Sequence, residues 1–350
     1  DVILFAIKDI EHVTIPSNIK KIDPSAFYSA KNIITFEFAP NSYLETICRS
    51  SFFGASLSKI VIPDSVKVIE DCAFENCYKN DIEVIISENS NLQSIGICAF
   101  RRTNIKHIFI PKFVKSIGSS AFYGSSLESI EFSKDSQLQK IGSYAFCSTK
   151  IRSIIIPKHV KDIIYSTFNN CAFLESVTFP EDSELEFIQS KAFEFSTISS
   201  LNFPPKLKEL DDNWRENTTN LNRITLSSNN QYFKCIDDKI IVQKSNPNND
   251  KYDILLLAFK DIEKAFIPSY IKVIKNNAFY GCKLEKVEFE ENSELEIIEE
   301  YAFANTVIQS DLIFPKNLKI IDAHAFNSSE FQSIIFPKDS KLYEIRNQAF

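Results

Sequence analysis

The sequence is poor in the residues on which most enzyme, membrane and nucleic-acid signals depend. Its 350 residues include no methionine, one tryptophan, six glycines and four histidines. No apolar run reaches the roughly 18 residues that a membrane-spanning helix needs. The 39 basic and 46 acidic residues give a net charge of −7, which argues against the basic face of a nucleic-acid binder. We therefore expect no nucleic-acid partner and no membrane span in this segment.

The lack of methionine also bears on where the sequence begins. No signal peptide is visible, and we expect that residue 1 is not a natural start. We expect the sequence to be an excerpt of a longer protein, with targeting and anchoring signals outside it.

Catalytic and cofactor motifs are missing as well. The patterns HExxH, GxSxG and GxxxxGK[ST] do not occur. All six glycines fall at two repeated positions, so none is left for a phosphate-binding loop. The histidines lie in different repeats, which argues against a shared metal site, and acidic pairs such as Glu184/Glu186 fall in solvated turns. We expect no enzyme activity, no catalytic residues, no metal site and no cofactor. The histidines are His12, His107, His159 and His324.

The eight cysteines show neither a CxxC pair nor a metal-ligand spacing. Cys77, Cys171 and Cys282 each stand three residues after a repeated phenylalanine, at one level of different repeats. A small buried apolar side chain explains that placement. A disulfide between adjacent coils, for example Cys72 with Cys98, is the alternative. The cysteine count does not fix the redox compartment.

What the chain has in abundance is one repeated unit, exemplified by IKHIFIPKFVKSIGSSAF at 105–122. A short strand pattern ends at Pro111, because proline has no N–H to offer a ladder. A tight apolar turn at 114–117 and an Ala-Phe pair at 121–122 complete the unit. No unit can bury its own apolar face, so the pattern predicts a stack of coils with one parallel sheet. The closing phenylalanine stands at 27, 52, 74, 100, 122, 146, 168 and 193, and again at 279, 303, 326 and 350.

The repeats alternate between two forms. Taking every second phenylalanine gives spacings of 46 to 48 residues, so the true unit is a pair. The short member reads IPxxVxxI, as in IPKHVKDI at 156–163. The long member inserts a polar Asn/Asp-Ser turn, as in FSKDSQLQKI at 132–141. Such side chains bond their own backbone and favour turns.

The pattern is interrupted after residue 210. Trp214-Arg215 replaces Ala-Phe, and residues 229–258 do not follow the repeat. One strand in QYFKCIDDKIIVQ, a turn at 245–250 and a second strand at 252–259 predict an inserted β-hairpin. Residues 253–280 then repeat the opening of the chain, 1–28, at a constant offset of 252.

The strand pattern LxxIxI, as in Leu127, Ile130 and Phe132, matches half of a leucine-rich repeat. Ile-Pro, VxxIG and AFxxC follow in place of the usual Asn/Cys position. Together these motifs resemble the BspA-like, or Treponema pallidum-type, leucine-rich repeats over almost the whole chain. The resemblance implies a surface or secreted protein of the kind found in oral and gut bacteria and in parasitic protists, with a role in adhesion. The family has no catalytic residues to transfer.

The sequence thus predicts a leucine-rich-repeat solenoid, an α/β-type horseshoe that is mostly β, with short strands and irregular or 3-10 turns. We expect about 14 repeats in alternating short and long pairs, in a single domain over 1–350, with a hairpin inserted at 229–258. The expected function is non-enzymatic binding of host proteins or other cells by a cell-surface or extracellular adhesin. A structural protein that self-associates end to end or into a coat is the main alternative, and a glycan-binding module is a third.

The predicted binding site lies on the outer face of the sheet. Between the last two apolar residues of a strand, one side chain points outward. At that position Val61, Ile85 and Phe109 stand on consecutive strands, with Ile155 two strands further on. Lys106 and His107 flank this strip. An exposed apolar strip favours a protein partner or cell-surface component, although such residues also simply suit strands.

Overall fold

The computed structural model describes residues 2–3, 11–79, 81–218, 220–246, 248 and 250–350, and these contain no helix. They form two compact units, 1–221 and 222–350, each of which is described by itself. Across both units the chain winds into about 14 coils of a mostly-β solenoid, as the repeat pattern predicts. That a single domain spans 1–350 remains a prediction.

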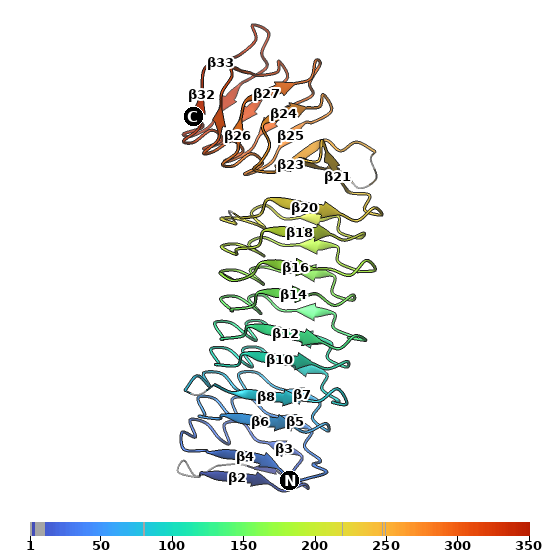
Figure 1. Cartoon of the computed structure of the whole chain (residues 1–350), viewed down its shortest axis with the longest axis vertical. Coiled ribbons are helices and arrows are strands. Elements are labelled where there is room, and N and C mark those ends of the chain that lie inside the picture. Colours follow the sequence, from blue (N-terminus) through green and yellow to red (C-terminus); the bar gives the residue numbers. More distant parts are fainter. Residues whose placement is uncertain (1, 4–10, 80, 219, 247, 249) are drawn as a thin grey trace. The chain divides into compact units, whose positions relative to one another are not determined.

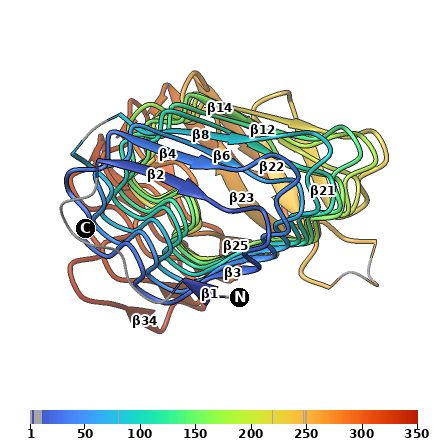
Figure 2. The same ribbon diagram turned by 90° about the horizontal axis from the view of Figure 1, so that it is seen from below.

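Each coil of the first unit contributes strands to two separate rows, which Figure 2 shows on different sides of the coil. The outer row is made by the LxxIxI segments. It comprises β2 (His12–Ile15), β4 (Thr35–Phe38), β6 (Lys59–Ile62), β8 (Glu83–Ile86), β10 (His107–Ile110), β12 (Ser129–Phe132), β14 (Ser153–Ile155), β16 (Ser176–Thr178) and β18 (Ser200–Phe203). The inner row comprises β1 (Val2–Ile3), β3 (Lys21–Ile22), β5 (Thr46–Ile47), β7 (Val68–Ile69), β9 (Ser94–Ile95), β11 (Ser116–Ile117), β13 (Lys140–Ile141), β15 (Asp162–Ile163), β17 (Phe187–Ile188) and β19 (Glu209–Leu210).

The inner row corrects the prediction of one sheet and of a tight turn at 114–117. Ser116 and Ile117 pair in parallel with Ser94 and Ile95 on one side and with the next coil on the other. Stacking keeps equivalent residues of successive coils in register. Even an extended dipeptide therefore finds ladder partners in the coils before and after it. The isoleucine of each dipeptide points into the core, as Ile117 does.

The repeated phenylalanines form the predicted buried stack. In the first unit neighbouring rings from Phe27 to Phe193 have centroids 5.0–5.6 Å apart and interplanar angles of at most 12°. In the second unit the rings from Phe279 to Phe350 are 4.7–5.2 Å apart. Trp214 occupies the alanine position of its coil, yet its buried ring lies edge-on to Phe193 at 6.1 Å. A large ring at the alanine position therefore supplies the aromatic contact where the phenylalanine is replaced.

The second unit has the same rows with one addition. Its outer row is β20 (Arg223–Leu226), β24 (Lys264–Ile267), β27 (Lys286–Phe289), β30 (Leu312–Ile313) and β33 (Ile334–Ile335). Its inner row contains β25 (Val273–Ile274), β28 (Ile297–Ile298), β31 (Ile320–Ile321) and β34 (Glu344–Ile345). A third row is β26 (Lys283–Leu284), β29 (Val307–Ile308) and β32 (Glu330–Phe331). The antiparallel strands are β21 (Phe233–Ile236), β22 (Ile240–Gln243) and β23 (Ile254–Ala258).

The inserted segment contains two successive hairpins where the sequence predicts one. The stretch expected as a single strand breaks at Asp237 and Asp238, both of which have φ above +50°. Two consecutive left-handed residues form the turn that favours a tight hairpin, so β21 and β22 pair antiparallel. β22 then pairs antiparallel with β23, which is close to the predicted second strand.

The offset of 252 between the two copies is reproduced in space. Ile254 and Leu255 of β23 pair in parallel with β25, just as Val2 and Ile3 of β1 pair with β3. In the first copy, residues 4–10 lie outside the described part of the chain. The inserted strand thus enters the inner row of its unit and continues directly into the repeats.

Ladders in the outer row follow the pairing of repeats. In each pair the short member bonds to the long member that follows, as in β6–β8, β10–β12 and β24–β27. Between the long strand of one pair and the short strand of the next, no ladder joins β12 to β14 or β27 to β30 in the described residues. Figure 1 shows β12 and β14 as successive strands of the stack. The outer sheet is therefore interrupted at these two boundaries, whereas β16 and β18 remain paired across theirs.

Candidate functional site: two equivalent grooves on the outer sheet face

The predicted apolar strip is only partly exposed. Val61 and Ile155 have 49% and 67% of their surface exposed, whereas Ile85 and Phe109 are half-buried. Val61 lies directly opposite Ile85, and Phe109 lies opposite Glu131. Glu131 thus separates Ile155 from the other three residues. That these side chains bind a partner remains a prediction.

Lys106 and His107 are exposed beside the strip, but both also connect neighbouring coils. The ammonium of Lys106 pairs with the Asp81 carboxylate, and Nδ1 of His107 lies 2.6 Å from the Ser129 hydroxyl oxygen. His12 repeats the second contact, with Nδ1 2.9 Å from the Thr35 hydroxyl oxygen. A histidine at the start of a short strand therefore has a structural use in two coils.

The cysteines of the AFxxC motif are structural, as the sequence predicts. Cys77, Cys171 and Cys282 are buried, and each thiol lies near a phenylalanine carbonyl oxygen of the preceding coil, at 3.0, 3.1 and 3.9 Å. Burial raises the pKa of Cys77 and of Cys171 to about 12. These thiols stay protonated at neutral pH and are poor nucleophiles.

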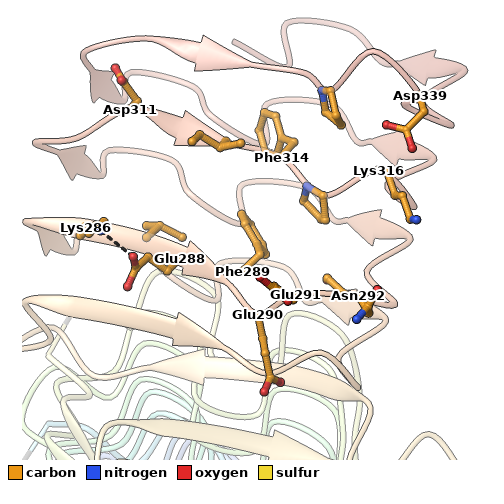
Figure 3. A pocket seen from close by; sticks show the side chains of 15 residues that line it. Lys286, Glu288, Phe289, Glu290, Glu291, Asn292, Asp311, Phe314, Lys316 and Asp339 are labelled. Atoms are coloured by element: carbon orange, nitrogen blue, oxygen red, sulfur yellow. Dashed lines mark ion pairs between the residues drawn. The ribbon is translucent and has the colours of Figure 1, made fainter.

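The sequence did not predict the most distinctive surface feature, which is a groove that occurs in both units. We call the first the Ile155 groove; its volume is about 850 Å³. The second, the Ile313 groove, has a volume of about 570 Å³ and is shown in Figure 3. Residues 129–137, 153–159, 180 and 182 line the first, and residues 286–293, 311, 313–316, 337 and 339 line the second.

The two grooves occupy the same place in the repeat. A shift of 157 or 158 residues carries Ser129 onto Lys286, Ile155 onto Ile313 and Asp182 onto Asp339. Each groove lies at a pair boundary, where the outer ladder is interrupted. On either side the longer members project their polar turns, so the short member between them is recessed.

The floor of each groove is apolar and rigid. Phe132, Ile156, Pro157 and Pro180 line the first, and Phe289, Phe314, Pro315 and Pro337 stand at the matching places in the second. The bordering turns are held by a serine hydroxyl that accepts the N–H two residues on, at 3.3 Å for both Ser136 and Ser293. The recess is therefore formed before any partner arrives, which lowers the cost of binding.

The rim of the Ile155 groove is largely neutralised. Three carboxylates and two lysines line it. Lys158 pairs with Asp182 at 2.7 Å, and this hydrogen bond holds the pKa of Asp182 below its ordinary value. Lys112 contacts Asp135 at 3.6 Å. In the described residues no ion pair engages Glu131, which stands beside the exposed Ile155.

The rim of the Ile313 groove is acidic. Five carboxylates and only two lysines line it. Lys286 pairs with Glu288 at 2.5 Å, and the Ser269 N–H donates to Glu290 at 2.7 Å. Figure 3 shows Asp311 and Asp339 towards opposite ends of the groove, with Phe289 and Phe314 between them. Among the residues that the structure describes, no ion pair neutralises either aspartate.

The coils, the phenylalanine stack and the short strands define a leucine-rich-repeat solenoid. The chain belongs to the family described as "BspA type Leucine rich repeat region", which matches in six copies over residues 3–81, 78–182, 139–238 and 257–350. No curated protein matches the chain. No helix in the described residues could cross a membrane.

Solved structures show the same fold at low identity. A leucine-rich repeat protein from Bacteroides ovatus is 22% identical with a TM-score of 0.65, over 95% of this chain and 82% of the other. The pneumococcal vaccine antigen PcpA is 22% identical with a TM-score of 0.61, over 84% and 76%. A leucine-rich cell surface protein from Faecalibacterium prausnitzii is 20% identical with a TM-score of 0.52, over 83% and 87%.

Proposed function

We propose that the chain is a non-enzymatic, protein-binding segment of a cell-surface or secreted adhesin. The observation that carries the proposal is the recurrence of one preformed groove at the same repeat position in two units. Family membership supports a binding role, and two of the similar structures are described as a vaccine antigen and a cell surface protein. The partner is a host protein or a component of another cell's surface.

The binding face is the outer sheet row. Val61, Ile85 and Phe109 present apolar surface on adjacent coils, and Ile155 stands in the first groove. Exposed apolar surface next to a preformed recess is the arrangement that association buries most favourably. Lys106 and His107 lie at the edge of this face and contribute polar contacts.

The test compares cell binding by the full chain with binding by two substituted forms. Fluorescently labelled protein is applied to intact epithelial cells, and bound fluorescence is measured by flow cytometry. Val61→Asp combined with Ile155→Asp should lower binding at least tenfold, because both side chains are exposed at the expected contact. Thr178→Asp is the matched control, since Thr178 is exposed on the same row outside both sets of residues.

Circular dichroism should show all three forms equally folded. The proposal is wrong if the folded double variant binds cells as well as the unsubstituted chain does. Light scattering on the same samples distinguishes a coat-forming protein, which would self-associate without any cell partner.

A further inference from the structure

Two cysteines far apart in the sequence lie together beside a buried carboxylate. The thiol sulfurs of Cys72 and Cys98 and a carboxylate oxygen of Glu75 all lie within 4.8 Å of one another. Glu75 is only 9% exposed, and the cysteines are half-buried. The cysteines are 26 residues apart, a spacing set by the coil period rather than by any local metal-binding motif.

The repeat geometry holds these side chains in place. Each cysteine stands two residues before a stacked phenylalanine, at φ 55°, so both leave the backbone in the same orientation. The Cys72 N–H donates to the Ile97 carbonyl at 2.7 Å, and the Phe74 N–H donates to the Ala99 carbonyl at 2.8 Å. These bonds fix the two coils in register, which stacks one thiol over the other. Glu75 follows Phe74 and turns back towards them.

The equivalent place in another coil already holds a cation. Lys191 corresponds to Cys72, and Glu194 corresponds to Glu75, each counted from the stacked phenylalanine. The ammonium of Lys191 lies 3.2 Å from Glu194 and 3.5 Å from Glu216 of the next coil. This position between two coils therefore accommodates a positive centre against the carboxylate. In the coil of Phe74 the corresponding residue is a neutral thiol.

Among the described residues, one cationic side chain forms an ion pair with the Glu75 carboxylate, which also hydrogen-bonds to Cys72. Arg101 lies 3.4 Å from one carboxylate oxygen, and its guanidinium also rests over the ring of Tyr123 at 5.4 Å. In the part of the chain that the structure describes, its buried Nε has no hydrogen-bond partner. Arg101 also acts on the Cys98 thiol, and Arg49 is the cationic side chain that acts on Cys72. Arg101 thus contacts both Glu75 and Cys98, and its guanidinium would have to move aside for an ion to bind between the two coils.

We propose that Cys72, Cys98 and Glu75 bind one zinc ion between the two coils. Two thiolates and one carboxylate are ligands that Zn²⁺ prefers, and water would complete a tetrahedral site. Ligand atoms around tetrahedral zinc are roughly 3.5–4 Å apart, so the present separations require only small side-chain rotations. Each thiol releases its proton to solvent on binding, and the ion joins two adjacent coils.

The experiment uses the full chain, reduced and stripped of metal with a chelator, with Co²⁺ as the spectroscopic probe. One equivalent of Co²⁺ should produce sulfur-to-cobalt charge-transfer absorption, and Zn²⁺ should abolish it by displacement. Zn²⁺ alone should raise the thermal unfolding temperature in a concentration-dependent way, because only the folded chain has the site. Glu75→Gln should weaken Co²⁺ binding about tenfold.

Cys72→Ser with Cys98→Ser should abolish the absorption without unfolding the chain. Serine is the natural residue at this position in other coils, including 25, 50, 120 and 166. Cys235→Ser, which changes a half-buried cysteine of the second unit, is the control and should bind Co²⁺ normally. Absorption that survives the double substitution, or that never appears, overturns the proposal. The proposal is also overturned if mass spectrometry of the chain isolated without reductant shows the loss of two hydrogens, and peptide mapping assigns this loss to a Cys72–Cys98 disulfide.

Discussion

The Ile155 groove and the Ile313 groove have one architecture and two different rims. Both have an apolar floor with two prolines, an exposed isoleucine and a serine-held turn. In the first, ion pairs such as Lys158–Asp182 neutralise the rim. In the second, Asp311 and Asp339 remain without an ionic partner in the described residues. The repeat therefore determines where a recess forms, and the residues that vary between repeats determine what it attracts.

The largest expected effect comes from breaking the buried phenylalanine stack in each unit. Phe303→Ala in the second unit and Phe122→Ala in the first should each cost about 3–5 kcal/mol, because each removes a fully buried ring from a stack. In a repeat array the loss should act locally. Native-state hydrogen exchange should show faster opening of residues 222–350 in the first variant and of residues 1–221 in the second.

That measurement also tests the organisation of the chain. If either substitution accelerates exchange equally in both units, the two behave cooperatively, as the predicted single domain over 1–350 requires. If neither substitution changes exchange, the buried stack is not the source of stability in this fold.

A smaller effect should follow from reversing the charge of the acidic rim. A short fluorescent peptide of alternating lysine and valine should bind the Ile313 groove, because its ammonium groups meet Asp311 and Asp339. Replacing both aspartates by lysine should weaken binding about tenfold, or about 1.4 kcal/mol. Fluorescence anisotropy measures the change, and added salt should weaken only the binding of the unsubstituted chain.

The Ile155 groove provides the matched control for that change. Asp135→Lys with Asp182→Lys should leave peptide affinity within about twofold, since both carboxylates already have lysine partners. Equal losses in the two double variants would show that overall charge, rather than the groove, attracts the peptide.

The smallest effect concerns one ion pair of the neutral rim. Lys158→Ala should return the pKa of Asp182 towards its ordinary value, because the hydrogen bond from Lys158 is the main cause of its lowering. Because the pKa of Asp182 is lower in the folded than in the unfolded state, its carboxylate stabilises the fold at pH values above the unfolded-state pKa. This stabilisation is lost as the pH falls through the folded-state pKa. The variant should lose only this contribution to stability, which varies with pH in the acidic range. NMR titration of the carboxyl group measures the change in the pKa of Asp182. An unchanged titration would mean that the pair is absent in solution.

The sequence predicted the solenoid well because one signal repeats many times. The closing phenylalanines, the Ile-Pro strand ends and the offset of 252 each recur, so a local ambiguity at one repeat is resolved by the others. The inner strand row was missed because Ser116-Ile117 looks like a turn when one repeat is considered alone. It becomes a strand only through its neighbours in the stack.

The grooves and the cysteine cluster were missed for a related reason. Each depends on residues from adjacent coils, such as Ser129 with Ile155 or Cys72 with Cys98. The separation of these residues in the sequence does not correspond to any known binding motif. The alternation of short and long repeats was the available signal, because each groove lies at a short coil between two long ones. The half-burial of Ile85 and Phe109 could not be predicted, since it depends on how side chains of neighbouring coils pack around them.

Trp214 gives this protein an optical property that follows from its position in the core. It is the single tryptophan of the chain, and its buried indole lies 6.1 Å from the ring of Phe193. Its fluorescence emission therefore reports on the last coils of the first unit alone. A shift of that emission to longer wavelength would reveal the fraying of one end of the phenylalanine stack, with no added label.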